Sequence, residues 1–303
     1  MATAATAAAT AGRERSSVRG PLRLSLLLLA LPAFVVITAF FVGPLVMLAL
    51  ESVRTFVPGR ITSDPSFTLE NYEKLLHPAF IHFFLDTFRL SFIAVVISLV
   101  LSYSIAYFVA RRRSGPVRSF YVALLIGMLF VSGMVRVYGL SLSLGTVGLF
   151  GLLREVLGLE RNNIVFLEAN VIIGIVHYTT PVMALTLLGT LQHIDHRLES
   201  AAQVLGATRA RAFLDTTLAL SIPGMTSAFA LGYAMAISAF TIPVFLGNGI
   251  VVAVTMLIYQ RFSEIPNYPF GSAIAVSLLA TSMLVVLLGL WLVRRLSPHA
   301  SQA

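Results

Sequence analysis

The chain has 303 residues, of which 57% are hydrophobic and 11% charged, and its mean hydropathy is +0.90. A soluble domain carries about 25% charged residues, so this composition excludes a water-soluble globular fold. The net charge of +8 comes from 20 Arg and one Lys against 13 acids, and in a membrane protein it reports loop orientation rather than nucleic-acid binding. No cysteine is present, which excludes disulfides, thiolate metal sites and cysteine nucleophiles.

Long stretches without charged residues predict the membrane-spanning helices. A spanning helix needs about 20 apolar residues. Six such stretches occur, the third interrupted only by Arg136. They are 24–50, 90–110, 119–153, 169–191, 216–260 and 265–293. The sequence therefore predicts an all-α integral membrane fold.

The third and fifth stretches are longer than one span, and turn residues divide them. In the fifth, Pro223 and Gly224 mark the start of a helix over 224–246, and a Gly-Asn-Gly turn at 247–249 follows it. The remaining segment, 250–260, is too short to span and is predicted to be interfacial or re-entrant. Glycines beyond Arg136 are interpreted as loosening the third stretch after one span, which gives six spans in all.

Basic residues predict the orientation of these spans. With the N-terminus inside, 13 basic residues fall on the cytoplasmic side and 6 outside, so both termini are expected to be cytoplasmic. A cleaved signal peptide is disfavoured because its apolar core runs about 7–15 residues, whereas this one runs 27. The expected division is a disordered cytoplasmic tail at 1–23, a first transmembrane helix at 24–50, an extracytoplasmic loop at 51–85, a membrane core at 86–293 and a cytoplasmic tail at 294–303.

No motif for catalysis, cofactor binding or metal binding is found. The sequence has no His-Glu-x-x-His, no Gly-x-Ser-x-Gly and no phosphate-binding loop, since its one lysine is Lys74. His193 and His196 are three residues apart, but no carboxylate cluster completes a metal site with them. Uphill transport by this chain would need energy from a partner or from an ion gradient.

A loop at 192–223, unusually long for the cytoplasmic side, carries the strongest local pattern. Asp195 suits a helix N-cap, and Gly206 suits the left-handed position that ends a helix. Between them an apolar stripe with helical spacing is formed by Leu198, Ala201, Ala202 and Leu205. The pattern fits a docking element, and it fits equally a helix that packs on its own spans or lies at the headgroups.

Several motifs resemble a known family. The segment Glu-Ser-Ala-Ala-Gln-Val-Leu-Gly-Ala-Thr at 199–208, with Phe213 and Ile-Pro-Gly at 222–224 downstream, resembles the EAA loop of permease subunits in binding-protein-dependent ABC importers. The segments 67–72, 103–107, 135–138, 242–247 and 269–273 resemble the spermidine/putrescine branch of that family, over about 67–290 of the chain. Three positions depart from the family pattern: Ser200 replaces the EAA glutamate, Ala219 replaces a proline, and 136–140 read Arg-Val-Tyr-Gly-Leu in place of Arg-Thr-Tyr-Ala-Trp.

The resemblance implies a type I ABC importer permease architecture with six transmembrane helices in the bacterial inner membrane. The implied partners are a second homologous permease subunit, an ABC ATPase dimer that uses ATP and Mg, an extracytoplasmic solute-binding protein and membrane lipid. This chain itself would be no enzyme and would bind no cofactor and no nucleic acid. The residues implied in coupling to the ATPase are Leu198, Glu199, Ser200, Ala201, Ala202, Leu205, Gly206, Ala207 and Pro223.

Polar and aromatic residues within the spans are candidates for the translocation path. A charge at mid-membrane costs about 2.5–3.5 kcal/mol on insertion scales, so Arg136 is expected to face protein or water. It fits a path residue, a structural ion pair or a side chain that reaches the interface. Aromatic faces attract cations, and the other candidates are Tyr138, Tyr178, Tyr233 and Phe240.

Two further observations concern charges near the outer face. Asp86 and Arg89 are expected to pair with each other, and Glu168 and Glu264 are interpreted as solvated loop acids or as attractors of cations.

Three functions fit a polytopic membrane protein. The resemblance favours an ABC importer permease for a polyamine-like or other small organic solute. A secondary transporter is disfavoured because no paired intramembrane carboxylates and no inverted repeat of broken helices are found. A purely structural subunit leaves the capped loop helix unexplained.

Overall fold

A computed structural model describes residues 31–59, 64–112, 115–145 and 163–296 of the chain, together with the single positions 148, 151, 156 and 158. The tail expected at 1–23 lies outside the described residues, as does 297–303 of the tail expected at 294–303; residues 294–296 belong to the last helix instead. Within them the fold is helical, and five helices are long and apolar enough to span a membrane. A bent pair of shorter helices makes a sixth span if the two count as one, as predicted.

The elements follow in this order. The first span covers Leu31–Ser52, with a π-turn η1 (Thr38–Val42) before α3 (Gly43–Ser52). An antiparallel pair, β1 (Arg54–Thr55) and β2 (Asp64–Phe67), and the short α4 (Glu70–Leu75) come next. The remaining elements are α5 (Pro78–Ala110), α6 (Pro116–Phe130), α7 (Gly133–Leu144), α9 (Ile164–His193), α10 (Arg197–Val204), α11 (Arg209–Ala212), η2 (Phe213–Leu218), α12 (Ala219–Ile237), α13 (Thr241–Leu246), α14 (Val254–Tyr259), η3 (Gln260–Glu264) and α15 (Tyr268–Leu296).

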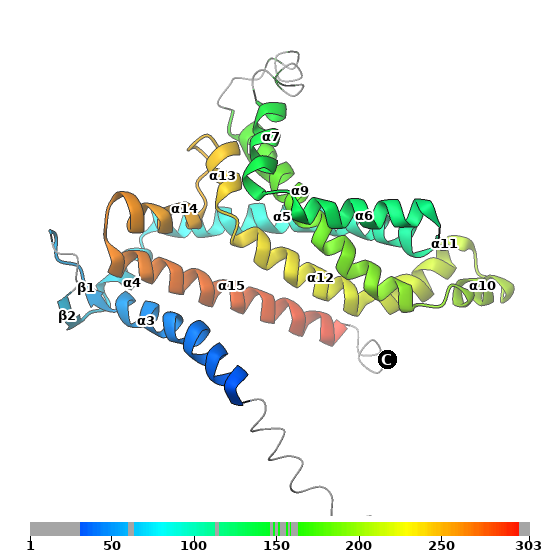
Figure 1. The fold of residues 1–303 in the computed structure, drawn as a ribbon, viewed down its shortest axis with the longest axis horizontal. Helices are drawn as coiled ribbons and strands as arrows, with labels where there is room; N and C mark the ends of the chain where they lie inside the picture. The colour runs from blue at the N-terminus through cyan, green and yellow to red at the C-terminus, as the bar shows by residue number, and fades with distance from the viewer. Residues whose placement is uncertain are drawn as a thin grey trace, which may run out of the picture.

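The two ends of the helix bundle differ in what they carry. Strands β1 and β2 and helix α4 gather at one end, and α10 and α11 lie at the other (Figure 1). Helix α15 runs from the end with β1 and β2 toward the end with α10, and α7 and α13 project together from one side (Figure 1). The EAA-like segment therefore lies at the tip of the bundle, where a partner has room to approach.

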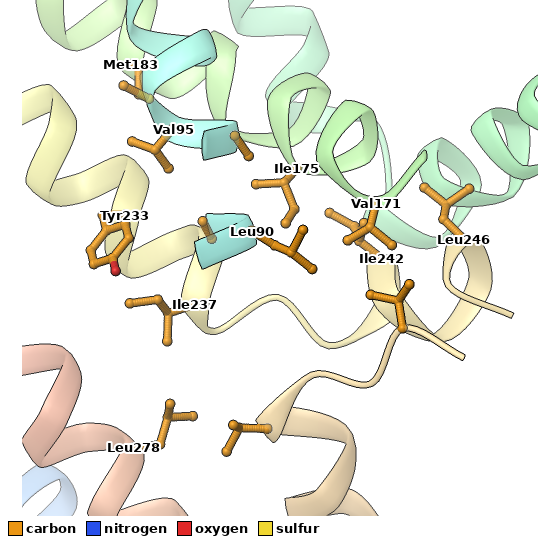
Figure 2. Packing of buried hydrophobic residues seen from close by; sticks show 14 of the residues in the cluster. Leu90, Val95, Val171, Ile175, Met183, Tyr233, Ile237, Ile242, Leu246 and Leu278 are labelled. Carbon is orange, nitrogen blue, oxygen red and sulfur yellow. The ribbon is translucent and has the colours of Figure 1, made fainter. Parts of the chain in front are cut away.

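Helices α5 and α9 form the centre of the fold, and α12 packs on both. The core at this junction includes Leu90 of α5, Ile175 of α9 and Ile237 of α12 (Figure 2). Polar pairs join α5 to α9 inside the core: the Ser98 and Thr179 hydroxyls are 2.7 Å apart, and Ser102 donates to the Thr180 carbonyl at 3.0 Å. Small and hydroxyl side chains let membrane helices approach closely, so these two helices form a rigid pair.

The third span is bent earlier than the sequence predicts. Helices α6 and α7 meet at an angle of 99°, and the bend is at Val131 and Ser132, before Arg136 and not among the glycines after it. The Arg136 guanidinium donates to the carbonyls of Met128 and Val131, the latter at 3.2 Å. It thereby satisfies backbone groups that the end of α6 leaves without helical partners.

The fifth stretch is also divided differently from the prediction. Pro223 is inside a continuous helical segment over Arg209–Ile237 and is not a break. Membrane helices tolerate proline where neighbouring side chains and local adjustments of the helix satisfy the freed backbone groups. The break falls instead between α12 and α13, at 238–240, where Thr255 donates to the Ala239 carbonyl at 3.1 Å. The 250–260 segment is the short α14 and its approach, as expected for a segment that does not span.

Candidate functional site

Helix α10 begins at Arg197, with His196 at its N-cap position and Asp195 one residue before it. The Asp195 carboxylate accepts a hydrogen bond from the backbone N–H of Arg197 at 2.9 Å, and the Asp195 carbonyl accepts from Leu198 at 3.2 Å. These contacts satisfy donors that the first turn of a helix leaves free. Asp195 therefore accepts a backbone N–H at the start of α10, as predicted, although His196 and not Asp195 occupies the N-cap position.

The other end of α10 is closed by Gly206. Its φ of +95° is in the left-handed region, which glycine enters without steric cost. The N–H of Gly206 donates to the Gln203 carbonyl and the N–H of Ala207 to the Ala202 carbonyl, both at 3.0 Å. This pair of bonds is a Schellman motif, so the prediction of a glycine-terminated helix is confirmed.

The apolar stripe predicted on α10 is largely exposed. Ala202 is half-buried against the protein, whereas Leu198, Ala201 and Leu205 are exposed. Leu205 is 88% exposed, and its neighbour Val204, which the sequence analysis did not select, is 87% exposed. The inward side of the helix is held instead by a polar residue, Glu199, which binds Arg111.

Glu199 belongs to a polar cluster with Arg111, Thr217 and Tyr107, which we call the Arg111 cluster. Arg111 follows the last residue of α5, and its Nη2 donates to Glu199 Oε1 at 2.6 Å and to Thr217 Oγ1 at 2.7 Å. The Arg111 Nη1 donates to the Ile194 carbonyl at 3.2 Å, just beyond α9. The Thr217 hydroxyl also donates to Glu199, and the Tyr107 hydroxyl donates to it at 3.3 Å.

The electrostatics of the cluster favour the charged form of Glu199. Burial by itself raises the pKa of the Glu199 carboxyl, but the hydrogen bonds from Thr217 and Arg111, the Arg111 charge and the Tyr107 hydroxyl lower it. The net pKa is below the ordinary value for glutamate. Glu199 is therefore an ionised anchor at neutral pH.

An aromatic layer supports the cluster from the membrane side. Phe213, at the start of η2, contacts the rings of Tyr107 and Tyr103 edge-on, with centroids 5.1 and 6.1 Å apart. The Arg111 guanidinium lies over the Tyr107 ring at 5.3 Å. These rings fix the end of α5 against the segment that leads into α12.

The candidates for the translocation path lie with different elements. Tyr233 and Phe229 of α12 line an apolar cavity of about 380 Å³ between α5, α12 and α15. The Phe240 ring contacts Tyr259, and the exposed Tyr138 contacts Phe245. Tyr178 is half-buried against the core, and Arg136 is bound to the end of α6. Within the described part of the chain, these contacts do not bring the five predicted residues together.

Charged groups at the opposite end of the bundle form a second pair. Arg89 contacts Asp86 at 3.4 Å, as predicted, and it also contacts Glu168 at the start of α9. Glu168 is therefore paired rather than free. Among the described residues, no three His, Asp or Glu side chains are placed to hold a metal ion.

Comparisons with known proteins place this geometry in a family. No family model matches the sequence. The spermidine/putrescine transport system permease protein PotB of Escherichia coli (strain K12) is 31% identical over 232 residues, which cover 76% of this chain and 84% of that protein. PotB of Haemophilus influenzae is 29% identical over 72% of this chain and 77% of that protein. The inner membrane ABC transporter permease protein YdcU of Escherichia coli is 26% identical, covering 82% and 84%.

Solved structures agree on the fold. A chain in the crystal structure of a bacterial alginate ABC transporter, in complex with a periplasmic protein bound to alginate pentasaccharide, has a TM-score of 0.72 at 17% identity. That match covers 90% of this chain and 95% of the other. The fold and the relatives together define a permease subunit of an ABC importer, a multi-pass protein of the inner membrane. Within that class, the chain belongs to the spermidine/putrescine transport permease (PotB) family.

Two features of the site were not found from the sequence. Arg111 entered the sequence analysis only as one of the basic residues that set the orientation, and Thr217 was not selected at all. The one local signal for the cluster is that Glu199 and Ala202 share a helical face by their three-residue spacing. That spacing does not identify a partner 88 residues away.

Proposed function

We propose that this chain forms half of the translocation path of an importer for polyamines or another small organic solute. A second, similar permease completes the path, two ATPase subunits dock beneath it, and an extracytoplasmic solute-binding protein delivers the solute. ATP and Mg are used by the ATPase, and this chain catalyses no reaction. The spermidine/putrescine systems of its relatives support the solute class, and the periplasmic protein of the alginate transporter supports the delivery step.

We propose further that α10 receives the displacement produced by the ATPase. One observation carries this: a short helix closed at both ends stands at the tip of the bundle and exposes Val204 and Leu205 almost completely. Large apolar side chains exposed together outside the spans mark an interaction surface. Closed ends keep the helix from fraying, so a push on it is transmitted as a rigid-body movement.

The orientation of the chain follows from the charge bias of its loops. With α10 in the cytoplasm, both termini are cytoplasmic and the end with β1, β2 and α4 faces outward. No residue in the most apolar part of the first span, Leu31–Ser52, is buried in this chain. The span is therefore available to contact lipid or the second permease.

Co-purification of the ATPase tests the docking role. The variant Val204→Asp/Leu205→Asp places two charges in the proposed interface. The matched control, Leu69→Asp/Leu76→Asp, changes two exposed leucines at the other end of the bundle. We expect the amount of ATPase that co-purifies with the first variant to fall ~10-fold or more, which corresponds to a loss of about 1.4 kcal/mol of binding free energy. The control is expected to bind as much ATPase as the wild type. Equal retention by all three would contradict the proposal.

Uptake into membrane vesicles tests the solute. Vesicles that contain the assembled transporter are given its solute-binding protein and labelled spermidine or putrescine. ATP-dependent accumulation supports the polyamine class, and accumulation of neither solute contradicts it.

A further inference from the structure

Arg111, at the C-terminal end of α5, binds residues of three other segments of the fold. Its guanidinium donates to the Ile194 carbonyl after α9, to Glu199 on α10 and to Thr217 in η2. Helix α5 is far from α10 in the sequence, so the two are joined through space. Among the described residues, Tyr107 and Arg111 make polar contacts from α5 and its C-cap to α10, and both reach Glu199.

The contact between Arg111 and Glu199 is shielded from water. The Arg111 side chain is 20% exposed and the Glu199 side chain 18% exposed. Hydrogen bonds between charged groups are shorter and stronger than those between neutral groups. Removal of one partner leaves the other as a partly buried group without its hydrogen bond. Truncation of Arg111 would leave the Glu199 carboxylate half-buried with Thr217 and Tyr107 as its remaining donors.

The covalent connections of α10 are short and turn-like. Residues 194–196 link it to α9, and 205–208 link it to α11, with glycine in the middle of the second link. These links fix the position of the helix ends but leave rotation about them possible. Arg111 restricts that rotation because it holds Glu199, in the first turn of α10, to α5, to the end of α9 and to η2 at once.

We propose that Arg111 is a positioning residue that makes α10, the α5–α9 pair and the η2–α12 segment move as one body. This inference rests on the proposed function of α10 as the element that the ATPase displaces. Docking depends on the outer face of α10, with Val204 and Leu205, whereas transmission depends on the inner face, with Glu199. Loss of Arg111 therefore separates ATP hydrolysis from transport without removing the docking surface.

Arg112 provides a matched control for Arg111. It is the next residue, it is exposed, and its guanidinium lies 4.7 Å from the ring centre of Phe108 within its own helix. Removal of this arginine changes the same charge at the same end of α5 without touching α10.

The test compares Arg111→Ala, Arg111→Lys and Arg112→Ala in the transporter assembled with its partners. Uptake per ATP hydrolysed is measured with the solute-binding protein present. Docking is measured separately, in the same variants carrying Val204→Cys, by a photoreactive crosslinker attached to that cysteine. The chain has no other thiol, so every crosslink to the ATPase starts from α10.

Arg111→Ala is expected to crosslink as well as Val204→Cys with Arg111 intact and to hydrolyse ATP, with uptake per ATP reduced about tenfold or more, within the range of measured couplings between sites. Arg111→Lys keeps the charge but not the planar fork, so its loss is expected to be intermediate. Arg112→Ala is expected to match the wild type. The intermediate loss in the lysine variant distinguishes positioning from a general folding defect.

Two results would overturn the inference. Unchanged uptake per ATP in Arg111→Ala would show that α10 transmits its displacement without this residue. A parallel fall of crosslinking and hydrolysis in both Arg111 variants would show that Arg111 serves only to fold α10. Absence of a crosslink from Val204→Cys with Arg111 intact is a separate result, since it contradicts the proposed docking and removes the basis of this inference with it.

Discussion

Two Arg–Glu contacts link α5 and its C-cap to other helices, Arg89 with Glu168 of α9 and Arg111 with Glu199 of α10, and they differ in their surroundings. Arg89 and Glu168 have side chains that are 50% and 23% exposed, and Asp86 is their nearest charged neighbour. Arg111 and Glu199 are 20% and 18% exposed and share hydrogen bonds with Thr217 and Tyr107. The same two residue types therefore form a solvated surface pair at one end and a partly buried cluster at the other.

This difference supports the proposal that the end with the Arg111 cluster transmits the movement of α10. An exposed pair contributes about 0–1 kcal/mol because water and salt screen it. A partly buried cluster cannot lose one member without leaving the others poorly bonded. The end with the Arg111 cluster joins four elements, whereas the end with Arg89 joins two helices that the core already holds together.

The largest effect is expected where α12 approaches α9 near the Arg111 cluster. A Cβ added at Gly224 would lie 2.3 Å from Thr190 Oγ1, whereas one added at Gly127 on α6 would have no atom within 4 Å. Overpacking of this kind costs about 1–3 kcal/mol. Gly224→Ala should lower the thermal unfolding temperature in detergent, and Gly127→Ala should not. Equal unfolding temperatures would show that the α9–α12 contact adapts easily.

The next effect compares the two glutamates directly. Glu199→Gln removes the charge that Arg111 binds and should reduce uptake about fivefold or more, in the range of typical coupling energies. Glu168→Gln removes the charge at the exposed pair and should leave uptake within about twofold of the wild type. Both are measured as initial uptake rates in vesicles at matched protein levels. Similar losses of uptake in the two variants would contradict the functional difference between the two Arg–Glu contacts.

A smaller effect is expected from the end of α10, which tests rigidity without changing the Arg111 cluster. A side chain at Gly206 meets no atom within 4 Å, so its effect is confined to the backbone conformation. The left-handed conformation costs most L-residues about 1–2 kcal/mol, and Asn tolerates it best. Gly206→Val should keep part of the ATPase association but lower uptake per ATP, and Gly206→Asn should lower it less. Normal uptake with Gly206→Val would count against a rigid α10.

The smallest effect is a pH dependence of stability that belongs to Glu199. Its pKa is lower in the folded protein than in the unfolded chain, where it is about 4.3. Its stabilising contribution is therefore complete above the unfolded pKa and is lost as the pH falls through the folded pKa. The unfolding temperature of the wild type should exceed that of Glu199→Gln at neutral pH, and the gap should close toward the acid end. A gap independent of pH would exclude this linkage.

Local rules predicted much of the fold and the ends of the candidate site. The hydrophobic stretches, the cap at Asp195, the left-handed Gly206 and the Asp86–Arg89 pair each depend on residues a few positions apart. The sequence alone was therefore sufficient to identify a capped helix between the fourth and fifth spans, and its motifs indicated the family.

The features that sequence reasoning missed depend on distant residues. The bend before α7 depends on Arg136 reaching back to carbonyls of α6, and the break after α12 depends on Thr255, 16 residues from the carbonyl that it satisfies. The Arg111–Glu199 contact crosses 88 residues. The sequence pattern of α10 therefore did not show that its apolar stripe is largely exposed while Glu199 holds the inward side.

The central claim is that α10 lies on the cytoplasmic face, where an ATPase covers its exposed end. Labelling of Val204→Cys with a membrane-impermeant thiol reagent tests this most directly, with Leu69→Cys as the control at the opposite end. The account predicts labelling of Val204→Cys in inside-out vesicles, protection when the ATPase is bound, and labelling of Leu69→Cys only in right-side-out vesicles. Labelling of Val204→Cys in right-side-out vesicles would contradict it.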